Sequence, residues 1–345
     1  MRTILITIAL ILMAVLVSET VMAQTFVENV SKTGTTAAPF LEIEVGARAI
    51  GMGGAFTATA NDITAIYWNP AGLATLKQGE ASFVHTQWLA DVNFDHVAAV
   101  IPVSPEIWFG GFVSAVTMNE MEVRTIDYPD GTGEYFQAND IAIGITGAWR
   151  LTDRLTIGGN GKYISQKIWH MSASSVALDL GLLFTTPFKD VRLGMSVSNF
   201  GPDMQMTGRD TRIYYDQDPT NPGNNDRIPA NLETEKWPLP LLFRVGLAGE
   251  VLENRFGRLT LAMDAVHPSD NHEYVNVGGE FSYRDWAFLR AGWKTLFLED
   301  TEQGLTAGAG IRYYLVGNTA FVADISYADF GRLERVIRYS LGIMF

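Results

Sequence analysis

Three oxygen-bearing side chains, Asp91, Asn93 and Asp95, are spaced like the first ligands of a calcium-binding loop. Such a loop needs glycine at its sixth position and glutamate at its twelfth, and this sequence has His96 and Pro102 there. We therefore expect an ordinary hairpin turn at this point and no calcium site.

Two histidines, His267 and His272, flank a short polar turn and carry nitrogen atoms that could bind a metal. Histidines in such a turn are more often simply solvated. The sequence contains none of the motifs G-x-S-x-G, H-E-x-x-H and G-x-x-x-x-G-K, which mark nucleophiles, zinc sites and phosphate-binding loops. We expect no catalytic residue, no metal site, no cofactor and no enzymatic activity.

Residues 46–73 differ from the rest of the chain because they combine small side chains with residues that cap helical turns. The first part of the stretch carries four glycines, which permit close approach of other backbone atoms. Asn61 and Asp62 can cap one helical turn. Asn69 can cap a second turn, with Pro70 at its first position, where a missing N–H does no harm. The stretch is too short to hold a core of its own, so it must pack against a larger structure.

The glycine run at residues 51–54 could instead be a degraded dinucleotide-binding fingerprint. That motif requires a buried strand before it and a long helix after it, within alternating strands and helices. Residues 41–45 are partly charged and no long helical pattern follows, so we reject this interpretation.

The order ARAIGMGGAF, then ND, then YWNPAGL resembles the N-terminus of the FadL-like superfamily, and within it the PorV/PorQ family. FadL proteins transport long-chain fatty acids. PorV is the outer-membrane shuttle of type IX secretion, which receives exported proteins and passes them to the attachment machinery. The resemblance implies an outer-membrane barrel with an N-terminal plug. The plug-motif residues are Gly46, Arg48, Gly51, Met52, Gly53, Gly54, Asn61, Asp62, Tyr67, Trp68, Asn69, Pro70, Ala71 and Gly72.

Composition excludes several classes of protein. The 345 residues include 33 glycines and no cysteine, and the net charge is −13. Without cysteine the chain has neither a disulfide framework nor a thiolate zinc site. The negative charge disfavours binding to nucleic acid and polybasic binding to anionic lipid. We expect no nucleic-acid partner.

The N-terminal residues 1–23 have the pattern of a secretory signal peptide, with Arg2 before an apolar run and small residues at the end. The apolar run is short for a membrane span, although a retained anchor helix is the alternative. Because no other run approaches that length, a membrane-embedded form would have to be a barrel. Residues 24–39 are polar and are interpreted as a flexible tail, and residues 40–78 as the plug segment.

From residue 79 onward, apolar and polar residues alternate with the period of a β-strand. Most expected strands reach the roughly 9–11 residues that cross a bilayer at a tilt, whereas soluble strands average about 5–6. We therefore expect an all-β fold, a fourteen-stranded antiparallel transmembrane β-barrel over residues 79–345, rather than a soluble sandwich. The strands are expected at 80–90, 93–102, 107–118, 141–151, 155–167, 173–186, 191–199, 239–251, 257–267, 273–283, 286–296, 304–315, 319–329 and 333–345.

The two faces of the expected strands differ in chemistry. A barrel in lipid turns its apolar face outward and its polar face inward. The polar face collects the charges that we expect to line the lumen, namely Lys162, Asp179, Arg192, Arg244, Asp264, Glu280, Arg290, Arg312, Asp324 and Arg338. Aromatic residues near strand ends are expected to form girdles at the membrane interfaces; they are Trp88, Trp108, Trp149, Trp169, Tyr283, Trp286, Trp293 and Tyr327.

The last strand ends on an aromatic residue of the apolar face. This ending resembles the assembly signal that outer-membrane barrels present to their insertion machinery. The residues of the signal are Tyr339, Leu341, Ile343 and Phe345.

The links between strands alternate in length, and the longest are residues 119–140 and 200–238. Barrels of this kind have short periplasmic turns and long outer loops. With an even number of strands, both the N-terminal segment and Phe345 are expected on the periplasmic side. The expected location is the outer membrane of a Gram-negative bacterium.

A lumen enclosed by fourteen strands would leak unless something filled it. We expect residues 40–78 to lie inside the barrel as a plug; the alternative is a periplasmic cap beneath its mouth. The expected hydrogen bonds run from Asn61, Asp62 and Asn69 to lumen arginines such as Arg244, Arg312 and Arg338.

Both long outer loops are acidic: residues 119–140 carry six acids against one base, and residues 200–238 seven against four. Such loops could keep the outer face soluble and bridge divalent cations with lipopolysaccharide. They could equally dock a protein partner or cover the lumen. Methionines at the loop bases would give an adaptable apolar lining.

The function expected first is a PorV/PorQ-like part in protein export or surface display, with exported proteins or secretion-system components as partners. The alternative is a FadL-like transporter of long-chain fatty acids or another hydrophobic small molecule. A third possibility is a purely structural outer-membrane protein. Outer-membrane lipid is a partner in all three cases.

Overall fold

The computed structural model describes residues 31–220, 223, 225–315 and 317–345, and residues 32–345 form one compact unit. The expected signal peptide at residues 1–23 and the first part of the expected tail, residues 24–30, lie outside the described residues. Within the described part of the chain, no helix has the length and apolar character needed to cross a membrane.

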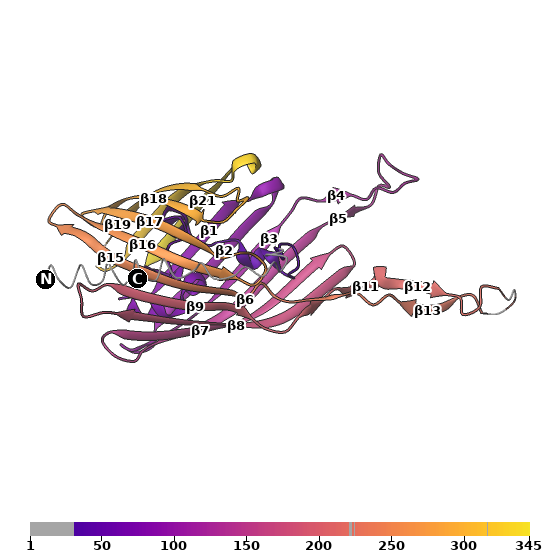
Figure 1. The fold of residues 1–345 in the computed structure, drawn as a ribbon, viewed down its shortest axis with the longest axis horizontal. Helices are drawn as coiled ribbons and strands as arrows, with labels where there is room; N and C mark the ends of the chain where they lie inside the picture. The colour runs from indigo at the N-terminus through magenta and orange to yellow at the C-terminus, as the bar shows by residue number, and fades with distance from the viewer. Residues whose placement is uncertain (1–30, 221–222, 224, 316) are drawn as a thin grey trace, which may run out of the picture. The chain divides into compact units, whose positions relative to one another are not determined.

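Fourteen long antiparallel strands form a closed barrel (Figure 1). The ring closes where β21 pairs with β1, from Glu80 opposite Met344 to Gln87 opposite Ile337. Closure gives the backbone of every strand a partner on both sides, which a free edge in lipid would lack. The barrel strands are β1 (Glu80–Gln87), β2 (Asn93–Pro102), β3 (Ile107–Thr117), β6 (Ala138–Arg150), β7 (Leu155–Ile168), β8 (Met171–Thr185), β9 (Arg192–Phe200), β15 (Leu242–Asn254), β16 (Gly257–Pro268), β17 (Tyr274–Tyr283), β18 (Ala287–Leu296), β19 (Leu305–Tyr314), β20 (Ala320–Asp329) and β21 (Arg335–Met344).

The expected fold class is confirmed, and each expected strand is present with ends that shift by a few residues. The first strand shows the cause of one such shift. It ends at Gln87 because Ala90 and Asp91, both with φ 57°, turn the chain in the 3₁₀ turn η3 (Leu89–Asp91). A left-handed backbone conformation cannot continue a strand.

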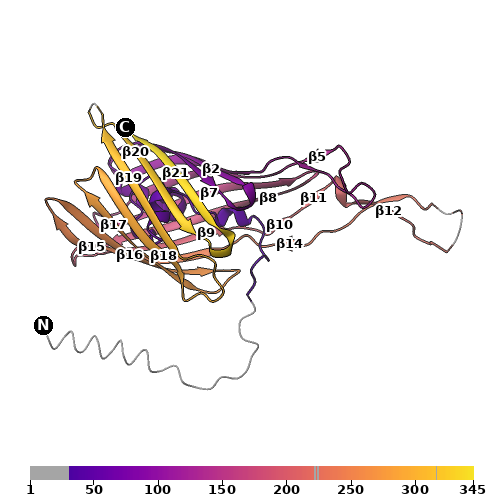
Figure 2. The ribbon, with the colours of Figure 1, turned by 90° about the horizontal axis from the view of Figure 1, so that it is seen from above.

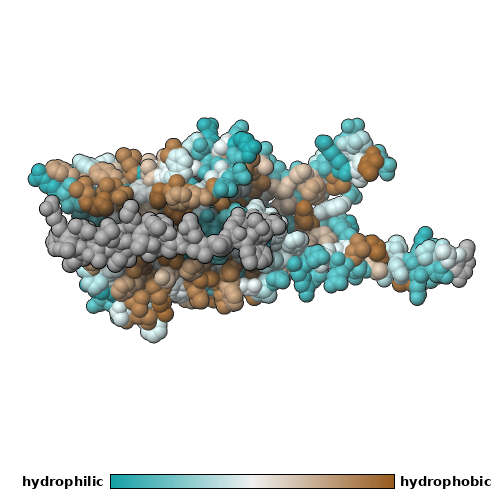
Figure 3. Space-filling view, viewed as in Figure 1, coloured by the Kyte–Doolittle hydropathy of each residue, from teal (hydrophilic) through white to brown (hydrophobic). Residues whose placement is uncertain are grey.

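The strands turn apolar side chains outward and small or polar side chains inward. In β6, Ala142 and Thr146 are buried, whereas Ile143 and Ile145 face outward and Ile145 is 63% exposed. Apolar residues accordingly gather over the barrel wall, and hydrophilic residues over the projecting loops (Figure 3). This is the arrangement of a barrel surrounded by lipid.

The two long links leave one end of the barrel as thin hairpins (Figures 1 and 2). We call this the long-loop end and the opposite one the short-turn end. The links contain short ladders rather than irregular loops alone. Their elements are β4 (Met121–Glu122) with β5 (Tyr135–Phe136), β12 (Arg212–Tyr215) with β13 (Ile228–Asn231), β10 (Met204–Gln205) with β14 (Lys236–Trp237), β11 (Thr207–Gly208) beside β8, and the turn η4 (Arg209–Thr211). A further 3₁₀ turn, η5 (Gly331–Leu333), joins β20 to β21.

The plug segment folds into four short helical elements inside the barrel: η1 (Pro39–Glu42), α2 (Ala47–Gly51), α3 (Ala65–Trp68) and η2 (Pro70–Thr75). The side chain of Asn69 accepts a hydrogen bond from the Ala71 amide at 3.2 Å, so it caps η2, and Pro70 takes the first helical position. Asp62 Oδ1 accepts from the Thr64 amide at 2.9 Å, just before α3.

The two ends of the described chain, which begins at residue 31, lie at opposite ends of the barrel; the expectation that both termini face the periplasm stays a prediction. The Phe345 amide donates to the Gly79 carbonyl at the short-turn end. At the long-loop end, the Ala37 amide donates to the Pro238 carbonyl and Thr36 Oγ1 to Asp270 Oδ2. The strand count could not reveal this, because residues 37–45 run through the lumen before the first strand begins.

A charge placed in the middle of the outward face tests whether that face meets lipid. Ile145→Arg should lower the free energy of unfolding by roughly 2–4 kcal/mol, because an arginine near the bilayer midplane is costly. Leu151→Arg, on the same face just beyond the end of β6, should cost no more than about 1 kcal/mol. Urea titrations of protein folded into lipid vesicles give both values. Equal costs for the two variants would contradict a membrane-embedded wall.

Candidate functional site

The plug backbone lies directly against glycines of the barrel wall. A Cβ added to Gly278 of β17 would come within 2.0 Å of the Met52 carbonyl oxygen, and one added to Gly181 of β8 within 2.2 Å of Asn69 Oδ1. Gly53 of the plug, with φ 68°, lies against the backbone of Val277 and Trp293 in a conformation that glycine adopts without strain. The glycines on the inner face therefore make room for the plug.

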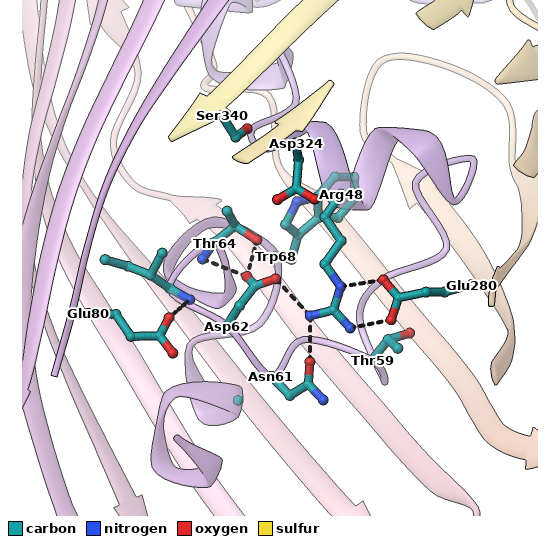
Figure 4. A network of polar contacts seen from close by, with 12 residues as sticks. Arg48, Thr59, Asn61, Asp62, Thr64, Trp68, Glu80, Glu280, Asp324 and Ser340 are labelled. Carbon is teal, nitrogen blue, oxygen red and sulfur yellow. Dashed lines mark hydrogen bonds and ion pairs between the residues drawn. The ribbon is translucent and has the colours of Figure 1, made fainter. Parts of the chain in front are cut away.

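Arg48 joins the plug to the wall at the short-turn side of the segment (Figure 4). Its Nε and Nη2 donate to the two carboxylate oxygens of Glu280 at 2.8 and 2.9 Å. Its Nη1 donates to Asn61 at 2.7 Å and to Asp62 at 2.8 Å. Burial alone would lower the pKa of Arg48, but the carboxylates of Glu280 and Asp62 hold it above its ordinary value.

The network continues along the wall. Arg290 Nε donates to Glu280 at 2.6 Å, and Arg290 Nη1 donates to Asp324 at 2.6 Å. Both Arg290 and Glu280 have side chains that are only 2% exposed. Three carboxylates, those of Asp62, Glu280 and Asp324, and two guanidinium groups thus share one network, in which each charge has an opposite partner.

The partners expected for the polar plug residues need correction. Asn61 and Asp62 bind Arg48 of their own segment rather than Arg244, Arg312 or Arg338 of the wall. Asn69 Nδ2 donates to the carbonyls of Thr57 and Leu182 at 2.8 and 3.0 Å. The physical reason is proximity: Arg48 of α2 lies within hydrogen-bond distance of Asn61 and Asp62 and takes the place that a wall arginine would need.

Asp264 and Asn160 hold the plug backbone from two further strands. Asp264 Oδ2 accepts from the amides of Phe56 and Thr57 at 2.9 and 2.8 Å. Asn160 Nδ2 donates to the Ile66 carbonyl at 2.7 Å. These contacts, together with those of Arg48, place the plug segment within the barrel rather than beneath its mouth.

Two buried arginines expected at the lumen lie on aromatic rings. The Arg244 guanidinium lies 5.5 Å from the ring centre of Tyr67 and 5.1 Å from that of Trp68. Arg338, which is 1% exposed, lies 5.4 Å from the ring of Trp88. Neither has a carboxylate within 4.0 Å among the described residues. Cation–π contact therefore takes the place of ion pairing.

The other expected lumen charges also point inward. Lys162 lies 2.8 Å from Asp179, and Arg192 lies 2.9 Å from Glu250. Arg312 is half-buried beside Phe288. One buried pair was not expected from the sequence, Lys294 of β18 with Glu44 of the plug. The alternation along the strand could have indicated this pair, because Lys294 lies four residues after Arg290 and therefore on the same inward face of β18.

All of the plug-motif residues lie in this segment. Gly46, Met52, the other motif glycines, Trp68, Asn69, Pro70 and Ala71 are buried, Arg48, Asp62 and Tyr67 are half-buried, and Asn61 is exposed. At the chain end, Tyr339, Leu341 and Phe345 of the expected assembly signal are exposed on the outer face, and Ile343 is half-buried.

Two of the aromatic residues expected at the girdles lie inside instead. Trp108 is 3% exposed and belongs to the core beneath the plug, and Trp88 packs on Phe330 with ring centres 5.4 Å apart. Trp149 and Trp293 do face outward. Position near a strand end therefore did not decide which face a tryptophan takes.

Apolar residues from the plug and the wall converge at the long-loop side of the plug. We call this region the outer chamber. A cavity of about 20 Å³ remains there, room for roughly one water molecule. Its lining is Phe40, Leu41, Ile43, Ile66, Tyr67, Phe94, Phe112, Ser114, Ala142, Lys162, Asp179, Ser198, Asn199, Leu242 and Arg244. Met204 and Leu239, from the base of the second long loop, belong to the same apolar cluster.

The chamber is filled by residues 37–43, which we call the strap. Few polar contacts hold the strap: Ala37 bonds to Pro238, the Ala38 amide donates to Gln166 Oε1 at 2.9 Å, and Tyr67 Oη donates to the Leu41 carbonyl at 3.2 Å. Burial raises the pKa of Glu42 in the strap to about 7, with the charge of Asp270 adding to the rise.

A serine–histidine pair that no sequence motif indicated lies beside the chamber. His96 Nδ1 and Ser114 Oγ are 2.8 Å apart on the neighbouring strands β2 and β3. His96 Nε2 is buried and finds no partner among the described residues, so no acid orients the ring as a triad requires. Asp95 of the rejected calcium motif pairs with His85 at 2.7 Å, and the described residues contain no cluster of metal ligands.

Comparison with known proteins identifies the type of barrel. The sequence model of the Uncharacterised protein family (UPF0164) matches residues 14–174, just under half of the chain. No curated protein matches the sequence. Among solved structures, the CymD monoaromatic hydrocarbon channel is similar with a TM-score of 0.56 and 12% identity, over 87% of this chain and 96% of that one.

Two further solved structures are similar at the same level. The Ralstonia pickettii toluene transporter TbuX has a TM-score of 0.53 and 15% identity, over 88% of this chain and 98% of that one. A Pseudomonas aeruginosa FadL homologue has a TM-score of 0.50 and 13% identity, over 87% and 98%. The chain thus has the fold of the FadL and toluene-channel barrels of the outer membrane. Its assignment to the PorV/PorQ branch stays a prediction.

Removing one partner of the Arg48–Glu280 pair should be costly, because the remaining charge stays buried. We expect Arg48→Gln to lower the free energy of unfolding by roughly 3–5 kcal/mol. Arg332→Gln, which breaks an exposed pair with Glu302, should cost no more than about 1 kcal/mol. Urea unfolding in lipid vesicles measures both. If Arg48→Gln costs no more than Arg332→Gln, the plug is not held by this pair.

The glycine contacts predict a second effect. Gly181→Ala should displace η2, because the new methyl group would overlap Asn69, and overpacking of this kind costs about 1–3 kcal/mol. Gly161→Ala is the matched control, since a Cβ there meets no atom within 4 Å. Hydrogen exchange of residues 65–75, read by mass spectrometry, should become faster only in Gly181→Ala. Equal protection in both variants would show that the plug does not rest on the wall there.

Proposed function

We propose that this protein is an outer-membrane channel that takes up a hydrophobic small molecule through the outer chamber. The observation that carries the proposal is the chamber itself. There Phe40 and Leu41 of the strap come together with Phe94 and Phe112 of the wall. Ligand pockets are typically apolar with a few convergent polar groups, and Lys162, Asn199 and Arg244 supply such groups.

The ligand would enter from the long-loop end, where Met204 and Leu239 lie over the apolar cluster. The strap fills the space that a ligand needs, so uptake requires the strap to move aside. Its few hydrogen bonds make such a movement less costly than displacement of the charged plug body. The similar solved structures include a monoaromatic hydrocarbon channel and a toluene transporter, which supports the same substrate class.

This proposal includes the location. A Gram-negative outer membrane fits the closed barrel, its apolar outer face and the pattern of short turns and long loops. The short-turn end would face the periplasm, with Phe345, and the long-loop end the exterior. In that orientation the described N-terminal segment, at Thr36, would emerge on the outer side.

No comparable observation supports the export function that the PorV/PorQ-like sequence motif suggests. The acidic hairpins at the long-loop end are compatible with a protein partner, but the described residues show no feature that selects an exported protein. A deletion strain separates the two functions. Loss of secreted proteins from the cell surface would favour export, and loss of hydrocarbon uptake with an intact surface would favour the channel.

Variants of the chamber test the channel directly. Phe40→Ala removes a buried ring of the strap, so uptake of radiolabelled toluene by a Gram-negative host expressing the variant should rise several-fold. Ala142→Trp fills the chamber from the wall and should reduce uptake to the level of cells without the protein. Phe109→Ala removes an outward-facing ring, 50% exposed, and should leave uptake unchanged. If Ala142→Trp transports toluene like the parent protein, the chamber is not the path.

A further inference from the structure

Three neighbouring turns at the short-turn end each place a basic residue beside an aromatic ring. They join β8 to β9, β15 to β16 and β17 to β18, and they follow one another around the barrel because β9 pairs with β15 and β16 pairs with β17. Adjacent turns are therefore two strand spacings apart, about 10 Å. We call these three turns the basic arc. The proposed uptake through the outer chamber makes no use of it.

Two turns of the arc repeat one pattern, an aromatic residue followed by a base and an aspartate. Residues 188–190 read FKD and residues 283–285 read YRD. In both turns the base and the aspartate have φ between 48° and 57°. Turns with two positive φ angles favour asparagine and glycine at these positions. A lysine or arginine there strains the backbone, so the formation of the turn does not by itself explain the base.

The three bases lie on exposed rings and have no acidic partner. Among the described residues, no carboxylate lies within 4.0 Å of any of them. Their rings are exposed, up to 72% for Phe188. A cation on an aromatic face keeps N–H groups free to donate to an anion. The distances from the cation to the ring centre are 6.0 Å for Lys189 on Phe188, 4.5 Å for Arg255 on Phe256 and 5.4 Å for Arg284 on Tyr283.

The acids of the same turns face the lumen instead. Asp190 and Asp285 line the cavity of about 760 Å³ on the short-turn side of the plug, whereas none of the three bases lines it. Asp285 lies 3.5 Å from Arg258 and accepts from Ser282 Oγ at 3.0 Å. Glu253 is directly opposite Arg258 in the ladder and so shares its inward face. The outer rim of the arc therefore presents cations, and the acids lie on its inner rim.

The arc differs in charge from the rest of the chain. The net charge is −13, and the acidic hairpins at the opposite end of the barrel contribute much of it. A net charge of that sign disfavours anionic lipid on average, and the arc is a local exception. At a membrane boundary, an aromatic ring can enter the apolar layer while the cation beside it stays at the surface. Cations in that position attract anionic headgroups.

We propose that the basic arc binds the headgroups of anionic phospholipids in the leaflet that meets the short turns. Lys189, Arg255 and Arg284 donate hydrogen bonds to the phosphate oxygens, and the rings beside them pack against the upper part of the acyl chains. The spacing of the turns places the three cations on neighbouring lipids along the wall. The bound lipids hold one side of the barrel, from β8 to β18, at the membrane surface.

Lipid binding to the folded protein in non-ionic detergent tests the arc. A fluorescent phosphatidylglycerol is titrated, and unlabelled phosphatidylglycerol or phosphatidylcholine competes for it. The parent protein should prefer phosphatidylglycerol by about tenfold or more, because each base beside an anionic surface contributes about fivefold. The triple variant Lys189→Gln, Arg255→Gln and Arg284→Gln should bind the two lipids with affinities within about twofold of each other.

A matched triple variant controls for the change in net charge. Arg209→Gln, Arg212→Gln and Arg227→Gln together remove three exposed bases from the long-loop end. This variant should keep the preference of the parent protein. The shift in gel mobility on heating confirms that each variant is a folded barrel.

Three results would overturn the proposal: no preference for phosphatidylglycerol in the parent protein, a preference that survives loss of the arc bases, or equal loss in both triple variants. Neither triple variant alters the outer chamber, so both should take up toluene like the parent protein. Failure of toluene uptake would therefore not affect the lipid site, and failure of lipid binding would not affect the channel.

Discussion

The structure depends on one constraint: the charges inside a narrow barrel have little water around them once the lumen is filled. A buried charge is tolerated only when an opposite charge or several hydrogen bonds compensate for its lost hydration. The plug supplies part of that compensation. Arg48 is placed against Glu280, and Glu44 against Lys294, so the plug segment and the wall neutralise each other across the lumen. Arg244 is held instead by the rings of Tyr67 and Trp68.

The same packing explains why the wall is rich in glycine on its inner face. A plug made of short helical turns presents carbonyl groups and side-chain amides that must come close to the strands. Gly278 and Gly181 allow contacts that a methyl group would forbid. The ion pairs hold the plug segment to particular strands, and the glycines allow its backbone to come close to the wall. The two effects together fix one position of the plug body.

The barrel was predictable from sequence because alternation over long strands is a strong signal and because a bilayer demands strands of that length. The cap at Asn69 and Pro70 followed from local chemistry. Other features depend on contacts between residues far apart in the chain. Arg48 meets Glu280 more than two hundred positions away, and no local pattern selects that partner. The path of the strap through the lumen and the inward turn of Trp108 are likewise set by tertiary packing.

This distribution of contacts decides which part of the plug can move. The plug body is held by buried ion pairs and by hydrogen bonds to strands around the ring, among them those from Asp264 and Asn160. Its displacement would leave several charges unpaired at once. The strap is held by apolar contacts and a few neutral hydrogen bonds, so its withdrawal uncovers the outer chamber while the charge pairs stay closed. In the proposed uptake, the barrel would therefore admit a hydrophobic ligand from one end without opening an aqueous path to the other.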